Sequence, residues 1–366
     1  MEQTTNTSAN YIGMFDLLKG IGMLFIILGH TVNNYSFANT TNPIGMAIFG
    51  VGYLLLGAGI MQAFFLISGY GFRKTKIVSC IKKQSQLILK PYLYIALATS
   101  ALHILTRFLM SHSLKSAIKQ TWSVFGGFLF ALPANKVMFG TQFYFCGAVW
   151  YIIALFIGWI LLNALMHPVK ERYLPFAVWI CAALGWFLGK DCVIPFCISQ
   201  GLIAVFYLYY GYRLKKTKAL SKPLSKVQIV LAVLICVVSL GLVAFTGKIN
   251  NMADGVWILG ILSIAFDGYI GYILLRISLK MNSLKGRIWK YIKKIGSNSF
   301  YIFAVHTVEI HGIPWWKLTE YMSDRPLLGC VLHFLLRCAF IIIGTLLLKK
   351  VVQNLANLKR NVKNKQ

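Results

Sequence analysis

The sequence predicts an all-α membrane protein: a polytopic bundle of about ten transmembrane helices with both termini in the cytoplasm. Three observations lead to this prediction. The chain of 366 residues is 58% apolar and has a mean hydropathy of +0.68, too apolar for a soluble domain of this length. Apolar stretches long enough to cross about 30 Å of hydrocarbon as helices recur along it. Basic residues gather in alternate connections between those stretches, and the absence of strand alternation excludes a closed β-barrel.

The apolar segments follow one another without a soluble domain or a Pro-, Gly- or Ser-rich linker between them. No internal repeat of about 20–50 residues is visible. One membrane domain over residues 1–366 is therefore predicted. The predicted segments lie at residues 12–33, 44–71, 86–108, 145–166, 172–189, 195–212, 227–247, 255–276, 297–312 and 328–351.

The connection at residues 109–144 is longer than most loops between helices. It holds an apolar stretch, "WSVFGGFLFALP", at residues 122–133. This stretch is too short to span a bilayer, so we predict an interfacial or re-entrant element facing outward.

The charge pattern sets the predicted topology. The connection at 31–43 has no Lys or Arg, whereas the next, at 72–85, has five. Further basic clusters follow the sixth, eighth and last segments, and the positive-inside rule places these connections and both termini in the cytoplasm. The net charge of +28 is therefore mostly topological and suits anionic membrane lipids as partners rather than nucleic acid.

The first segment, "FDLLKGIGMLFIILGH" at residues 15–30, carries three titratable side chains. Lys19 and His30 are eleven residues apart, about 20° from alignment on a helix, and Asp16 lies one turn before Lys19. One interpretation is an interfacial Asp16–Lys19 ion pair with His30 ending the helix. The other is a polar path through the bundle, because intramembrane ionisable groups usually mark a substrate or proton route. A histidine there can accept and return a proton near neutral pH.

A second histidine, His306 in "YIFAVHTVEIHG", is predicted at the same depth as His30, in the outer half of the membrane. Glu309 follows it by one turn. Two histidines at matched depth favour a shared site over separate packing roles. Asp267 and Arg337 also lie within apolar segments, where they could pair across helices or belong to the polar path.

A metal site is not predicted, although His30, His306 and Glu309 could supply three ligands. No His-x-x-His or Glu-x-x-His spacing accompanies them. The eight cysteines form no Cys-x-x-Cys pair. No phosphate-binding loop, dinucleotide fingerprint or Gly-x-Ser-x-Gly elbow is present.

Five short segments occur in order over nearly the whole chain. The first is a basic residue, ten residues and then a histidine, here Lys19 to His30. The others are "FFLISGY" at 64–70, "AVWYIIALF" at 148–156, "FYLYYGYRLKK" at 206–216 and "IGSNSFYIFAVHT" at 295–307. Through these segments the sequence resembles the acyltransferase 3 family of bacterial membrane O-acyltransferases, which modify cell-surface sugars.

The resemblance implies an acyl-CoA donor at the cytoplasmic side and a surface glycan or lipid-linked sugar acceptor near the outer face. We expect acetyl-CoA as the donor, with succinyl or another short acyl group as the alternative. His30 would act as general base for the acceptor hydroxyl or as a transient acyl carrier. Lys19 stands where the family commonly has an arginine, which keeps the charge but not the bidentate fork. The candidate catalytic residues are His30, Lys19, Asp16 and His306.

The resemblance also implies where the donor binds. Basic residues after the second segment would meet the phosphates of coenzyme A. The family often has an Arg-x-x-Arg pattern before the proline of the third helix, and "KKQSQLILKPY" departs from it with Gln84, Gln86 and Lys90. The candidate donor-binding residues are Arg73, Lys74, Lys82, Lys83 and Lys90.

Two functions from different classes fit these features. The first is an acyl-CoA-dependent O-acetyltransferase of the bacterial cytoplasmic membrane. The second is a proton-coupled exporter of a small polar or sugar-like solute, which also needs charged stripes inside a helix bundle. Consumption of acetyl-CoA distinguishes them.

Overall fold

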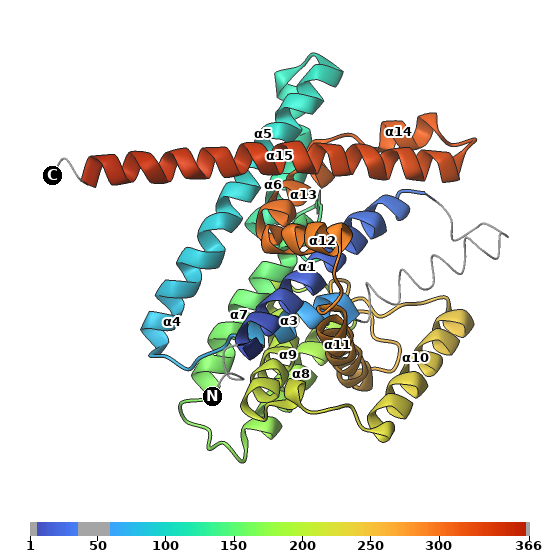
Figure 1. The fold of residues 1–366 in the computed structure, drawn as a ribbon. Coiled ribbons are helices and arrows are strands. Elements are labelled where there is room, and N and C mark those ends of the chain that lie inside the picture. The colour runs from blue at the N-terminus through green and yellow to red at the C-terminus, as the bar shows by residue number, and fades with distance from the viewer. Residues whose placement is uncertain (1–5, 36–58, 364–366) are drawn as a thin grey trace.

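The computed structural model describes residues 6–35 and 59–363, and this part of the chain is helical almost throughout (Figure 1). A π-helical turn, Ser85–Leu89, joins two of the helices. The helices are α1 (Asn6–Val32), α3 (Met61–Tyr70), α4 (Ile77–Gln84), α5 (Lys90–Ser111), α6 (Leu114–Leu129), α7 (Trp150–Leu165), α8 (Leu174–Gly189), α9 (Ile198–Lys216), α10 (Lys226–Thr246), α11 (Ile261–Met281), α12 (Arg287–Ser297), α13 (Ser299–Gly312), α14 (Trp316–Tyr321) and α15 (Pro326–Lys363).

A helix occupies each predicted apolar segment, although much of the segment at 44–71 lies outside the described residues. Six helical stretches in the described part are long and apolar enough to cross a membrane: Gly13–Val32, Ile77–Ser111, Gly147–Leu165, Lys226–Thr246, Ile261–Met281 and Pro326–Leu358. The chain is thus a multi-pass membrane protein of the all-α class. The number of crossings and the side of each terminus stay predictions.

Helix α9 lies at the centre of the bundle and packs against α3, α7 and α8. Glycines allow its close approach to α3. A Cβ added at Gly211 would lie 2.1 Å from the carbonyl oxygen of Leu66, and one at Gly69 would lie 2.1 Å from that of Leu208. Small residues at such crossings are typical of membrane bundles, where backbone packing replaces the hydrophobic effect between helices.

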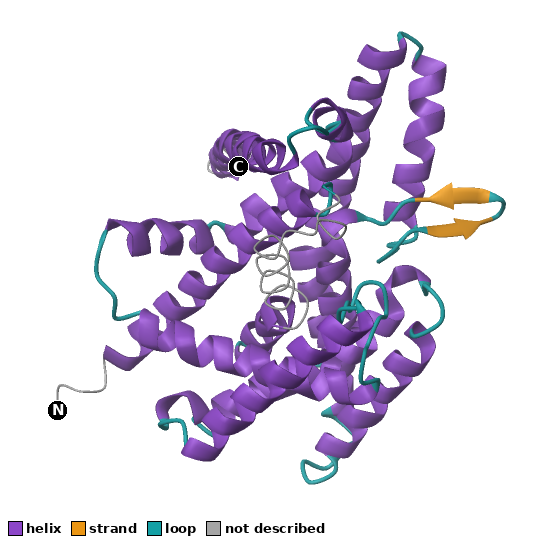
Figure 2. Cartoon of the chain, turned by 90° about the vertical axis from the view of Figure 1, so that its right-hand side faces the viewer, coloured by secondary structure: helices purple, strands orange, loops and turns teal. Residues whose placement is uncertain are grey.

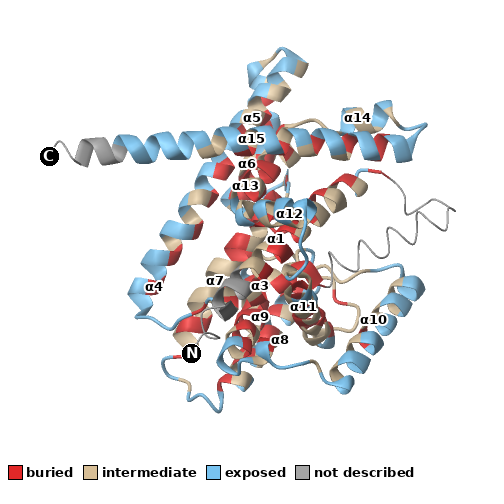
Figure 3. Ribbon diagram, viewed as in Figure 1, coloured by how far each residue is buried: buried red, intermediate tan, exposed pale blue. Residues whose placement is uncertain are grey.

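The surface exposes many apolar side chains, including several of α10 and α15. Figure 3 shows much of both helices in the pale blue of exposed residues. Helix α10 is the most apolar span by hydropathy, yet only 6% of its most apolar window is buried. An apolar helix left so exposed suits contact with lipid tails rather than with water. Burial and hydropathy therefore agree on a membrane setting.

The connection at 109–144 contains more regular structure than an interfacial loop. Helix α6 packs against α5, and His112 and Ser113 connect the two helices. The Ser113 side chain caps α6 by accepting a hydrogen bond from the Ser116 amide. A hairpin of β1 (Lys136–Met138) and β2 (Thr141–Phe143) follows, drawn in orange in Figure 2. The apolar stretch at 122–133 thus forms the second half of α6 and the turn after it.

Candidate active site

Two histidines from distant parts of the chain meet inside the bundle. His30 lies in the last turns of α1, and His306 lies in α13. Their ring centroids are 5.2 Å apart. His306 is fully buried, whereas His30 is partly exposed. The structure thus brings together the two histidines that the sequence places at one depth.

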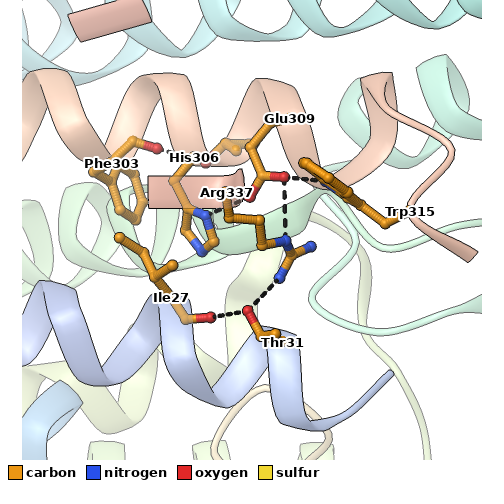
Figure 4. Close-up of polar contacts among 8 residues, drawn as sticks. Ile27, Thr31, Phe303, His306, Glu309, Trp315 and Arg337 are labelled. Carbon is orange, nitrogen blue, oxygen red and sulfur yellow. Dashed lines mark hydrogen bonds and ion pairs between the residues drawn. The ribbon is translucent and has the colours of Figure 1, made fainter. Parts of the chain in front are cut away.

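Glu309 fixes the orientation of the His306 ring (Figure 4). Nδ1 of His306 lies 2.7 Å from Oε1 of Glu309, one helical turn farther along α13. The other carboxyl oxygen, Oε2, accepts a hydrogen bond from the indole nitrogen of Trp315. Because that indole can only donate, its proton position is not in question. An Nδ1–H donated to Glu309 leaves the lone pair of His306 on Nε2.

Arg337 of α15 connects this pair to α1. Its Nε lies 3.3 Å from Oε2 of Glu309, and both side chains are buried. Its Nη1 donates to the Thr31 hydroxyl over 3.4 Å, while that hydroxyl donates to the Ile27 carbonyl over 2.8 Å. The guanidinium balances the charge of Glu309 and links α15 to both α13 and α1. Figure 4 shows its contacts with Glu309 and Thr31.

A cavity of about 730 Å³ opens beside His30. Its size suits a ligand of several tens of atoms, since ligand pockets commonly span about 300–1,000 Å³. Its lining is mixed, with imidazole, guanidinium, amide and indole groups among apolar side chains. The polar and aromatic residues that line it include His30, Asn33, Asn34, His103, Arg107, Asn135, Trp150, Asn250, Asp254, His311, Trp315 and Arg337.

Asp16 and Lys19 lie elsewhere on α1. They form an ion pair with 2.7 Å between Lys19 Nζ and an Asp16 carboxyl oxygen. Neither is among the residues that line the cavity. Lys19 is eleven residues before His30, about 16 Å along the helix axis. The structure therefore places this ion pair and His30 at separate points of α1.

The five candidate donor-binding residues are all exposed and lie outside the cavity lining. The loop that carries the first two is held by Asn163 of α7, which accepts from the Thr75 amide and donates to the Thr75 carbonyl, both over 2.9 Å. A fixed backbone with solvated basic side chains can receive an anionic ligand. The residues concerned are Arg73, Lys74, Lys82, Lys83 and Lys90.

The pairing of Asp267 with Arg337 is not observed. Arg337 pairs with Glu309, and Asp267 accepts a hydrogen bond from the Asn250 amide over 2.9 Å. The sequence shows that both charges need a buried partner but not which one, because that depends on how α11 and α15 pack. His311 gives no signal in the sequence either, yet it lines the cavity.

Within the described part of the chain, no group of three or more His, Cys, Asp or Glu side chains is arranged to hold a metal ion. His306 and Glu309 use each other as partners, and Arg337 occupies the space beside the carboxyl group. The three side chains are therefore held by hydrogen bonds and an ion pair among themselves.

Comparison with known proteins gives one finding. The profile of the acyltransferase 3 family, described as an acyltransferase domain, matches residues 12–349. No curated protein and no solved structure matches the chain significantly. The matched range covers nearly the whole chain, including both histidines and the helices that hold them. The chain therefore belongs to the acyltransferase 3 family and is a membrane acyltransferase.

Proposed function

We propose that the protein moves an acetyl group from cytoplasmic acetyl-CoA to a hydroxyl of a cell-surface polysaccharide or its lipid-linked precursor, in the cytoplasmic membrane of a bacterium. The observation that carries this proposal is the histidine pair beside a cavity large enough for an acceptor and the end of an acyl donor. Family membership supports acyl transfer as the chemistry.

His30 is the general base in this proposal, because it is the accessible member of the pair. It takes the proton of the acceptor hydroxyl as the oxygen attacks the thioester carbonyl. The tetrahedral intermediate then collapses, the carbon–sulfur bond breaks, and the protonated His30 returns the proton to the leaving thiolate. The products are the acetyl ester and free coenzyme A, so protons and charge balance without another reactant.

His306 supports His30 rather than touching the substrate. Its Nε2 is buried and has no hydrogen-bond partner among the described residues. A lone pair there can accept a proton or a hydrogen bond from the neighbouring His30 ring. Glu309 holds the tautomer, as the acidic member of a catalytic triad holds its histidine.

The donor would enter from the basic side of the protein. The exposed cluster around Arg73 and Lys74 suits the phosphates of coenzyme A, and the narrow pantetheine arm would carry the thioester toward His30. The sequence predicts a depth for Lys19 between the basic cluster and His30. Lys19, which is paired with Asp16, would contact the pantetheine arm or adjust the electrostatic field along it.

The test is release of coenzyme A from acetyl-CoA by purified protein in liposomes. His30→Ala is expected to lower the rate by at least about 100-fold, the usual range for a general base. His112→Asn is the matched control, because His112 is exposed at the α5–α6 turn and asparagine tolerates its positive φ of 51°. Equal rates in wild type and His30→Ala would reject His30 as the base. Transport of a sugar without coenzyme A release would favour an exporter.

A further inference from the structure

The cavity contains a second positively charged residue, Arg107, whose setting differs from that of Arg337. Arg107 lies near the end of α5, is partly exposed and lines the cavity. Its Nε donates to Nε2 of His103 over 3.2 Å, one turn earlier on the same helix. His103 is buried, with 4% of its surface exposed.

Hydrogen-bond directions show that His103 accepts a hydrogen bond from Arg107. The Thr121 hydroxyl of α6 donates its proton to the Ala117 carbonyl, so it accepts from Nδ1 of His103 over 2.8 Å. The lone pair of His103 is then on Nε2, where it faces the Nε–H of Arg107. The chain Thr121–His103–Arg107 therefore fixes the guanidinium through Nε and leaves both Nη groups available.

No acidic side chain of the described residues neutralises Arg107. None forms an ion pair with it within 4.0 Å, and its two Nη groups have no hydrogen-bond partner there. Residues 36–58 contain no Asp or Glu. Asp254 also lines the cavity, but the Asn251 side chain donates to its carboxyl group.

Two other arginines find their hydrogen-bond and charge partners within the protein. Arg337 pairs with Glu309, and Arg276 donates to the carbonyls of Ala219, Leu220 and Lys222. An arginine oriented by a buried histidine, with a free fork in a cavity, is arranged for a ligand. Two parallel N–H groups fit a carboxylate or a phosphate, and these charge-assisted contacts are among the strongest hydrogen bonds in proteins.

We propose that Arg107 binds a negatively charged group, a carboxylate or a phosphate, on the acceptor, so that the cavity selects anionic acceptors over neutral ones. This inference rests on the proposed function, because it takes the cavity as the acceptor site. Coenzyme A is the other source of such a group. Lys83 and Arg107 are 24 residues apart on the continuous helical stretch Ile77–Ser111, about 36 Å. Donor phosphates held at the basic loop would thus be a bilayer's thickness away.

The experiment measures binding to the full-length protein in nanodiscs by isothermal titration. The probes are two matched pairs: glucuronate against glucose, and glycerol 3-phosphate against glycerol. Wild type is expected to bind each anion about tenfold or more tightly than its neutral partner. Arg107→Gln should abolish that preference and leave the KM for acetyl-CoA unchanged. Lys119→Gln, which removes an exposed charge on α6 outside the cavity, should keep it.

Several outcomes would overturn the inference. Equal binding of anionic and neutral probes by wild type would do so without any variant. A preference for the anionic probes that persists in Arg107→Gln would also overturn it. So would an Arg107→Gln variant that loses only acetyl-CoA binding, because Arg107 would then bind the anionic group of the donor. Arg107→Lys keeps the positive charge but loses the two parallel N–H groups, so it should retain a reduced preference for the anionic probes. This variant tests the inference even if Arg107→Gln folds poorly.

The same measurements separate this inference from the proposed function. If turnover depends on His30 but wild type shows no preference for anionic probes, the proposed acceptor selectivity is rejected and the acyltransferase function stands. If the preference for anionic probes depends on Arg107 but acetyl-CoA is not turned over, the anion-binding site stands and the proposed reaction is rejected.

Discussion

At the scale of single residues, the site combines one accessible group with several buried ones. His30 and the largely buried Arg337 line the cavity, whereas His306 and Glu309 are buried behind it. A buried charge pair contributes little net stability, since the cost of desolvation offsets the attraction, but removing one partner leaves an uncompensated charge. The Glu309–Arg337 pair therefore orients the site more than it stabilises the fold.

Arg337→Gln is expected to destabilise the protein by about 3–5 kcal/mol, because the Glu309 carboxylate loses its cation in a buried site. The double variant Glu309→Gln with Arg337→Gln should regain part of that loss. Thermal unfolding in detergent measures both. A loss in the double variant equal to the sum of the two single losses would contradict the pairing, because coupled partners give losses smaller than their sum.

Glu309→Gln alone should lower the rate of coenzyme A release by about 100-fold or more, since a neutral amide no longer fixes the His306 tautomer. The KM for acetyl-CoA should change little, because Glu309 touches no substrate. Steady-state kinetics in liposomes separate the two parameters. An effect on KM alone would instead place Glu309 in donor binding.

The sequence predicts part of this site for a clear reason. Depth along a membrane helix follows from counting residues, so His30 and His306 could be matched, and Glu309 shares a face with His306 at a spacing of three. The partner of Arg337 could not be predicted. Two buried acids were available, and only the packing of α15 against α13 decides for Glu309 over Asp267.

At the scale of elements, the α3–α9 crossing depends on two glycines. Gly211→Val should cost about 1–3 kcal/mol or prevent folding, because the added atoms meet the Leu66 carbonyl. Gly241→Ala on α10 is the control, since its Cβ would meet nothing within 4 Å. Thermal unfolding of both variants tests the crossing. Equal stability of the two variants would contradict it.

Elements differ in how well hydropathy predicts them. The long apolar helices were predicted because twenty-odd apolar residues have few alternatives in a membrane. Helix α12 lies outside the predicted segments because it is short and basic, and it packs across α1, where a Cβ at Gly296 would meet the Asp16 carbonyl at 1.7 Å. The sequence predicts only an interfacial or re-entrant element where α6 lies, because the pairing of α6 with α5 is a tertiary feature.

At the scale of the whole molecule, a cytoplasmic donor and an outer acceptor require the basic loops and the α5–α6 hairpin to face opposite sides of the membrane. A cysteine at Lys74 should react with an impermeant maleimide only in inverted vesicles. A cysteine at Phe139, which is 87% exposed in the β1–β2 turn, should react in intact cells. Both substitutions belong in a variant without the eight native cysteines. Labelling of both sites from one side would contradict the topology drawn from the positive-inside rule.

The central claim is that the two histidines act together in acyl transfer. The most direct test measures coenzyme A release for wild type, His30→Ala, His306→Ala and the double variant. Residues that act as a unit give strongly non-additive losses. If the two histidines act as one unit, His30→Ala is the most impaired single variant and the double variant is no slower. Independent, additive losses, or full activity in His30→Ala, would contradict it.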